Sequence, residues 1–205
     1  MIYDEADEAI RIMNRQNLKA FGRLKLAKFD DLNLIRQVDK VYDGSVKEAK
    51  QKYRRIARDA FIEGLIMAHI SREDTSDWAD DVITNDWLLD MLEEVDPVTL
   101  YVFTTETERK KQRLIEALTA ATDKGKEVDK ALRYWTLQIG QYALNAVDRA
   151  VIDAFREAGV ERVRWNTQED ERVCETCDDR DGKIYRIDKL PVKHYMCRCW
   201  ITPVF

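Results

Sequence analysis

Apolar residues along most of this chain recur at steps of three and four, the spacing of one face of an α-helix. One run covers residues 46–65, and a longer one covers residues 128–158 and stops at Gly159, a residue suited to a left-handed helix end. These patterns predict two buried helical stripes. Their members are Val46, Ala49, Tyr53, Ile56, Ala57, Ala60, Phe61 and Leu65 in the first stripe, and Leu132, Trp135, Ile139, Tyr142, Ala143, Ala146, Val147, Ala150, Val151, Ala154 and Phe155 in the second.

Turn and capping residues predict where the first of these helices begins. Asp43 and Gly44 form a dipeptide that is typical of turns. The spacing of Ser45 and Glu48 is that of a capping box. In such a box the serine oxygen and the glutamate carboxylate each accept a hydrogen bond from an otherwise unpaired backbone N–H. The sequence therefore predicts a helix start at Ser45.

Shorter elements are predicted between the two stripes. Asp96 before Pro97 is a typical helix start, and Thr105 with Glu108 forms a second capping box. The predicted elements are a loop with one short helical turn over residues 72–86, a helix over 87–95, a new helix from 97, a helix opened at 105 and ending near 121, and a turn over 122–126.

The pattern changes after Gly159. Residues 160–165 mix apolar and charged side chains as a half-buried strand does, and residues 183–187 follow a turn at Asp181 and Gly182. Residues 161–205 are therefore predicted to form a small module that contains β-structure. A module of this size rarely buries enough apolar surface to be stable without a metal, a disulfide or a larger neighbour.

Composition supports a mainly α fold with a small C-terminal α+β module. The 205 residues include only 7 Gly and 3 Pro, too few for a sandwich or barrel, and 45% are hydrophobic, too many for a disordered chain. The net charge of −5 excludes a global positive field for nucleic acid or an anionic membrane. With no long apolar stretch and an acidic start, we expect a protein made in the cytoplasm, with no membrane partner.

All four cysteines lie among the last 32 residues, which favours a metal site over scattered disulfides. Cys174 and Cys177 are followed, after sixteen residues, by His194 and Cys197, the spacing of a zinc site with two knuckles. Cys199 is a fifth candidate, because residues 197 and 199 of an extended segment face the same side. We expect four of these five to bind structural Zn²⁺, with Cys199 the weakest candidate; reduced, merely buried cysteines or a disulfide are the alternatives.

A longer signature surrounds these ligands. It comprises Trp165 to Asp170, the run Glu171-Arg172-Val173-Cys174-Glu175-Thr176-Cys177, the run Asp181-Gly182-Lys183-Ile184-Tyr185, and the run Pro191-Val192-Lys193-His194-Tyr195-Met196-Cys197-Arg198-Cys199. It resembles the C-terminal signature of bacteriophage head morphogenesis proteins, the minor head proteins similar to protein F of phage Mu. The family often has an Arg-Thr-Glu-like step in its long helix, where this chain has Gln138 to Gln141.

The resemblance implies a head morphogenesis domain over residues 126–205 and leaves the helical residues 1–125 without a family assignment. It implies a structural, non-enzymatic minor capsid protein that associates with the portal protein and with capsid or scaffolding proteins, and that affects DNA packaging or ejection. It also implies a location in the host cytoplasm during assembly and then in the phage head. No small-molecule substrate is expected.

Charge and chemistry also suggest other functions for this chain. The basic run Arg109, Lys110, Lys111 and Arg113 is a candidate DNA contact, although such a run is more often a solvated helix face. A zinc-stabilised nucleic-acid-binding module or nuclease is the main alternative, and a toxin using this module as an adaptor is a third. Residues 161–205 carry nine Lys and Arg against nine Asp and Glu, so they have no net basic character. We expect Arg198 to pair with Asp178, Asp179 or Asp181.

Overall fold

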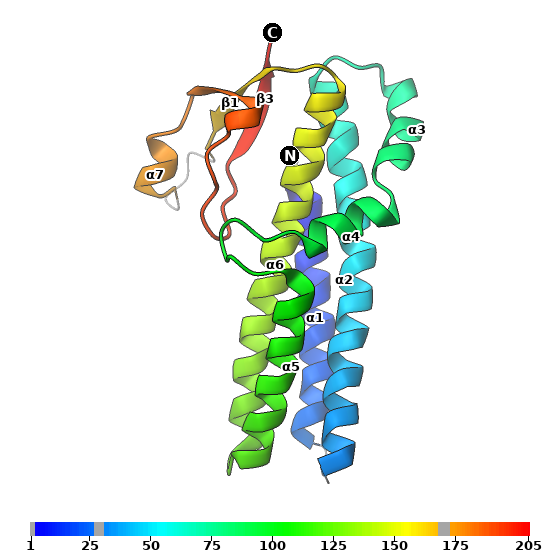
Figure 1. Ribbon diagram of the computed structural model, residues 1–205, viewed down its shortest axis with the longest axis vertical. Coiled ribbons are helices and arrows are strands. Elements are labelled where there is room, and N and C mark those ends of the chain that lie inside the picture. Colours follow the sequence, from blue (N-terminus) through cyan, green and yellow to red (C-terminus); the bar gives the residue numbers. More distant parts are fainter. Residues whose placement is uncertain (1–2, 27–30, 168–172) are drawn as a thin grey trace.

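Four long helices lie side by side and form an elongated bundle, with a small β-module at one end (Figure 1). The computed structural model describes residues 3–26, 31–167 and 173–205. The bundle consists of α1 (Asp4–Leu26), α2 (Asp31–Met67), α5 (Phe103–Ala120) and α6 (Lys124–Glu157). Helices α2 and α6 pack along each other, and α1 and α5 each contact both. The predicted mainly α fold with a small C-terminal α+β module is confirmed.

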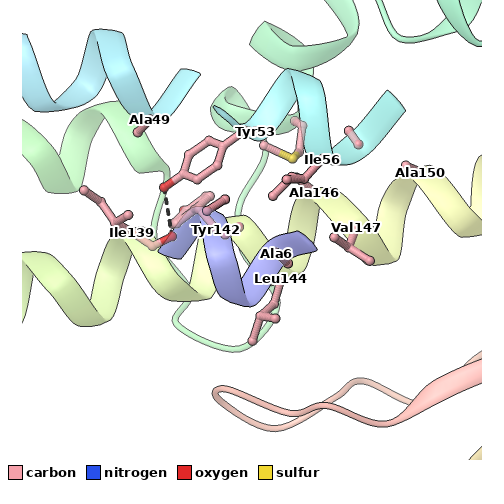
Figure 2. Close-up of a cluster of buried hydrophobic side chains, with 14 of the residues drawn as sticks. Ala6, Ala49, Tyr53, Ile56, Ile139, Tyr142, Leu144, Ala146, Val147 and Ala150 are labelled. Carbon is pink, nitrogen blue, oxygen red and sulfur yellow. Dashed lines mark hydrogen bonds between the residues drawn. The ribbon is translucent and has the colours of Figure 1, made fainter. Parts of the chain in front are cut away.

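Helix α6 carries the predicted second stripe. Its members from Trp135 to Phe155 are buried, and Leu132 is partly buried. The helix ends as predicted, with Gly159 in the left-handed region at φ 72°. Figure 2 shows the centre of this core, where the Tyr53 hydroxyl donates a hydrogen bond of 2.9 Å to the Ile139 carbonyl. Because α6 belongs to the same core as α1 and α2, it joins the bundle to the module that follows it.

The predicted helix start at Ser45 is wrong, because α2 continues without a break through residues 43–45. The Ser45 hydroxyl donates to Asn17 of α1 over 2.6 Å and accepts from the Trp135 indole N–H over 2.7 Å. The apolar face extends through the predicted turn, with Tyr42 and Ala49 fully buried on either side. Burial of that continuous face outweighs the local turn preference.

The segment between α2 and α5 also differs from its prediction. Residues 72–82 form a true helix, α3 (Arg72–Val82), where a loop was expected. It packs against α2 and buries Thr75 and Ala79. This packing stabilises a helix in a sequence with little intrinsic preference for helix. The predicted next helix is present as α4 (Asn85–Glu93), with the Thr84 hydroxyl accepting from the Trp87 backbone N–H.

No helix begins at Pro97. The Asp96 carboxylate instead accepts hydrogen bonds from the backbone N–H groups of Val98 and Thr99, at 2.8 and 2.6 Å, and this closes a turn. The next helix, α5, is present as expected but begins at Phe103 without a side-chain cap, so the predicted capping box is not formed.

The C-terminal module contains a three-stranded antiparallel sheet in the order β2-β1-β3. The predicted strands are present as β1 (Arg162–Asn166) and β2 (Ile184–Arg186). The third strand, β3 (Trp200–Val204), was not predicted. It includes Pro203, which pairs with Val163 and is tolerated because β3 lies at the sheet edge. A one-turn helix, α7 (Glu175–Asp178), and a 3-10 turn, η1 (Ile187–Lys189), complete the module.

Candidate metal centre

Four of the five predicted ligands lie in two tight turns, and the fifth, Cys199, directly precedes β3. Cys174 precedes α7 and Cys177 lies within it, while His194, Cys197 and Cys199 lie on the segment 190–199. Each predicted pair closes the same kind of turn. The backbone N–H of Cys177 bonds to the Cys174 carbonyl at 2.9 Å, and that of Cys197 bonds to the His194 carbonyl at 3.1 Å. The two pairs are therefore equivalent knuckles, as their spacing predicts.

The structure places the five donors in two overlapping groups that share Cys177. Cys174, Cys177 and His194 form one group and Cys177, Cys197 and Cys199 form another, with the ligand atoms of each group within 4.8 Å of one another. The sulfur atoms of Cys177 and Cys197 are 3.7 Å apart, and His194 Nε2 is 3.1 Å from the Cys177 sulfur. Two sulfurs that each lie about 2.3 Å from one tetrahedral ion are separated by about 3.8 Å. The spacing of the sulfurs suits a single ion.

The chemistry of the donors also suits a metal ion. All four cysteines are free thiols, and three of them, Cys177, Cys197 and Cys199, are buried. A cluster of several thiols and one imidazole is typical of sites for soft or borderline metals. This cluster can hold a metal ion, and four protein ligands around one ion leave no position for a reacting water.

The thiols differ in their electrostatics. A hydrogen bond from the Cys199 thiol, aided by the Cys199 backbone and the charge of Lys193, lowers the pKa of Cys197. Burial raises the pKa of Cys177 to about 12. Donation to Cys197, together with burial, raises the pKa of Cys199. The thiolate is the form that binds metal, and a cation bound at the cluster would lower the pKa of each of these thiols.

The segment that carries His194, Cys197 and Cys199 is also fixed to the helical bundle. Lys193 forms an ion pair of 2.7 Å with Asp148 of α6, and the Met196 backbone N–H donates to Gln141 of α6 over 2.7 Å. Arg198 pairs with Asp7 of α1, so the expected pairing within the module is wrong.

Sequence reasoning missed these bundle contacts. Gln141 stood out only because it lies in the step where the family that the signature resembles often has Arg-Thr-Glu. Nothing local in the sequence marks Tyr3, Asp7 or Asp148, since each is more than 40 residues from its partner in the segment. The signature residues 168–172 lie outside the described part of the chain.

The candidate DNA-contacting residues are located on α5. Arg109 and Lys110 pair with Glu106 at 2.6 and 3.2 Å, and Lys111 pairs with Asp43 of α2 at 2.6 Å. Lys111 is buried and ties α5 to α2. Arg113 is exposed, and no ion pair connects it to another residue within the described ranges. Three of the four cations thus have carboxylate partners inside the protein.

Comparison with known proteins gives no relative: no family model, no curated protein and no solved structure matches this chain. Among the described residues, no helix combines the length and the apolar character needed to span a membrane.

Proposed function

We propose that the cysteine and histidine cluster binds one structural Zn²⁺ and that the protein is a minor head protein of a tailed bacteriophage or prophage. Two overlapping groups of three donors, which share Cys177, carry the first part of the proposal. The sequence signature around those donors carries the second part. The cluster and the signature occupy the same residues, so both parts concern one module.

Zinc fits this module because the module buries few apolar side chains of its own. Its sheet has three short strands, and only Val163, Trp165, Ile201 and three cysteines contribute buried apolar side chains between residues 161 and 205 in the described ranges. Structural zinc contributes roughly 10–16 kcal/mol of apparent binding free energy in small domains. An ion at the cluster would therefore join α7 to the segment before β3.

A structural role in the phage head agrees with the order of the elements. The long helix α6 is followed by the strand β1 and by the first cysteine knuckle at α7. The strand β2 and the second knuckle, residues 194–199, come next. The phage proteins that the signature resembles have these parts in the same order. In this proposal the bundle presents the module to the portal and capsid proteins, and no catalytic step is assigned to the protein.

Co-purification with the portal protein tests the proposed role. The tagged full chain, expressed in cells that produce the phage, is expected to retain portal protein through affinity purification. Cys177→Ser is expected to lower the recovery, because the module loses a donor common to both groups, whereas Asp188→Asn on the exposed surface keeps it. Absence of portal protein, combined with cleavage of plasmid in Mg²⁺ by the purified chain, would overturn the proposal in favour of a nuclease.

A further inference from the structure

Residues that reach the helical bundle alternate with candidate metal ligands along one short segment. Lys193, Met196 and Arg198 contact α1 or α6, whereas His194, Cys197 and Cys199 belong to the cluster. The same backbone therefore serves both the metal site and the bundle. A change in the path of this segment therefore alters both the metal-cluster contacts and the contacts with the bundle.

Lys193 makes the most extensive of these contacts. Its ammonium group donates to Asp148 Oδ1 at 2.7 Å, to the Tyr3 hydroxyl at 2.8 Å and to the Cys199 carbonyl. These three acceptors use all three of its N–H donors. The side chains of Lys193 and Asp148 are only 18% and 21% exposed, so the pair is largely removed from water. Loss of one partner from such a pair is costly because it leaves an uncompensated charge.

Tyr3 extends this network to the first turn of the chain that the structure describes. It is 4% exposed, and its hydroxyl lies 3.0 Å from the Cys199 carbonyl and within hydrogen-bond distance of Asp148. The first turn of α1 lies at the module end of the bundle (Figure 1). Cys199 therefore offers its sulfur to the metal cluster and its carbonyl to residues of the helical bundle.

Two further contacts keep the segment close to the helices. The Met196 backbone N–H bonds to Gln141, and the Met196 side chain lies so near Gly140 that an added Cβ there would be 3.2 Å from its methyl carbon. Met196 has a φ of 55°, the left-handed conformation that closes the second knuckle. Arg198 pairs with Asp7, one turn along α1 from Tyr3.

We infer that metal binding at the cluster is coupled to docking of the first turns of α1, with Asp148 and Tyr3 as positioning residues for the metal-binding segment. Metal ligation fixes the backbone of residues 194–199. This keeps the Cys199 carbonyl within reach of the Tyr3 hydroxyl, and it keeps Lys193 within reach of Asp148. The coupling is reciprocal by thermodynamic necessity. Weakening the Asp148 contact lowers metal affinity, and removing the metal loosens the start of α1.

Metal affinity tests the first half of this coupling. The inference rests on the proposed zinc site but not on the phage role. Zn²⁺ affinity of the full chain is measured by competition with a chromophoric chelator, for the wild type and for Asp148→Asn, Tyr3→Phe and Asp188→Asn. Loss of an outer-shell partner typically lowers metal affinity about 10- to 100-fold, and we expect about tenfold for Asp148→Asn. Tyr3→Phe removes one hydroxyl and is expected to lower affinity by about threefold.

Asp188→Asn is the matched control, because Asp188 also pairs with a cation of the module, Arg186, but lies on its surface. We expect wild-type affinity for it. The visible spectrum of bound Co²⁺ should be the same in all four proteins, since none of the substitutions removes a ligand. Failure of the wild type to bind Zn²⁺ would overturn the proposed site itself. Wild-type affinity in both Asp148→Asn and Tyr3→Phe would overturn the coupling alone.

Hydrogen exchange tests the second half. In the wild type, removal of Zn²⁺ with a chelator is expected to speed amide exchange in residues 3–13 while the middle of α2 stays protected. Asp148→Asn is expected to show faster exchange in residues 3–13 even with Zn²⁺ bound, and Tyr3→Phe provides the same test if Asp148→Asn does not fold. Unchanged exchange in residues 3–13 on metal removal would contradict the inference.

Discussion

At the scale of single residues, Ser45 shows how a local pattern can mislead. Its spacing to Glu48 matches a capping box, but its hydroxyl joins two side chains that are 28 and 90 residues away. The hydroxyl accepts from Trp135 and donates to Asn17, so it links α6 to α1 from within α2. No pattern within one helix can reveal such a bridge, because its partners are set by packing.

Replacing Ser45 with alanine is expected to destabilise the protein. The buried indole N–H of Trp135 and the Asn17 amide would both lose a partner, and an unsatisfied buried polar group costs about 1–3 kcal/mol. Urea denaturation should show this loss as a lower midpoint. Ser71→Ala is the control, because Ser71 is exposed and its side chain does not cap α3; its effect should stay within about 0.5 kcal/mol. Equal midpoints for the two variants would contradict the bridge.

Glu106 is expected to give stability a dependence on pH. Burial alone would raise the pKa of Glu106, but hydrogen bonds from Arg109 and Lys110 outweigh it and lower the pKa below its ordinary value. A group with a lowered pKa in the folded state stabilises the protein above its unfolded pKa and loses this effect as the pH falls through the folded value.

The test compares the wild type with Glu106→Gln by denaturation at about pH 7, 5 and 3.5. The wild type should be more stable near neutral pH, and the difference should shrink as the medium becomes acidic. Glu116→Gln, which changes an exposed carboxylate on the same helix, should show no such trend. A difference that is constant with pH would argue against a role for the Glu106 ion pairs.

At the scale of elements, the contact between α2 and α6 depends on small side chains. A Cβ built on Gly64 would lie 2.7 Å from the Ala154 Cβ, closer than such atoms approach in proteins. Gly44 lies in the same helix α2, and a Cβ there meets no described atom within 4 Å. Gly64 is therefore required for close packing of the two helices, whereas Gly44 has room for a side chain.

This pair gives a matched prediction. Gly64→Ala should destabilise the protein by about 1–3 kcal/mol, because the core must expand to admit the methyl group. Gly44→Ala should stabilise it by about 0.5–1 kcal/mol, because alanine restricts the unfolded chain and fits a helix. Thermal or urea unfolding measures both. Destabilisation by Gly44→Ala would mean that residues 43–45 form the turn that the sequence first indicated.

The two buried helical stripes were predictable, whereas the start of α2 and several short elements were not. The stripes of α2 and α6 contain many periodic residues, so a single turn-favouring residue such as Gly44 does not interrupt the folded helix. Helix α3 is acidic and has little apolar periodicity, and it forms because Thr75 and Ala79 pack on the bundle. Strand β3 contains Pro203, which argues against a central strand and is compatible with a strand only at the sheet edge, where β3 lies.

At the scale of the whole molecule, the cysteine spacing predicted a cluster that the fold assembles. Two tight turns need only local sequence, and this is why the donor residues could be named in advance. The attachment of the cluster to the bundle could not be predicted, because Tyr3 and Lys193 are separated by 190 residues. The fold thus connects both ends of the chain at the candidate metal centre.

The metal content of the purified full chain tests this account most directly. Elemental analysis after extensive dialysis should find about one zinc ion per chain in the wild type and much less in Cys177→Ser, because structural zinc sites bind tightly enough to survive purification. A protein without stoichiometric metal, whose melting temperature is the same with and without chelator, would contradict the account.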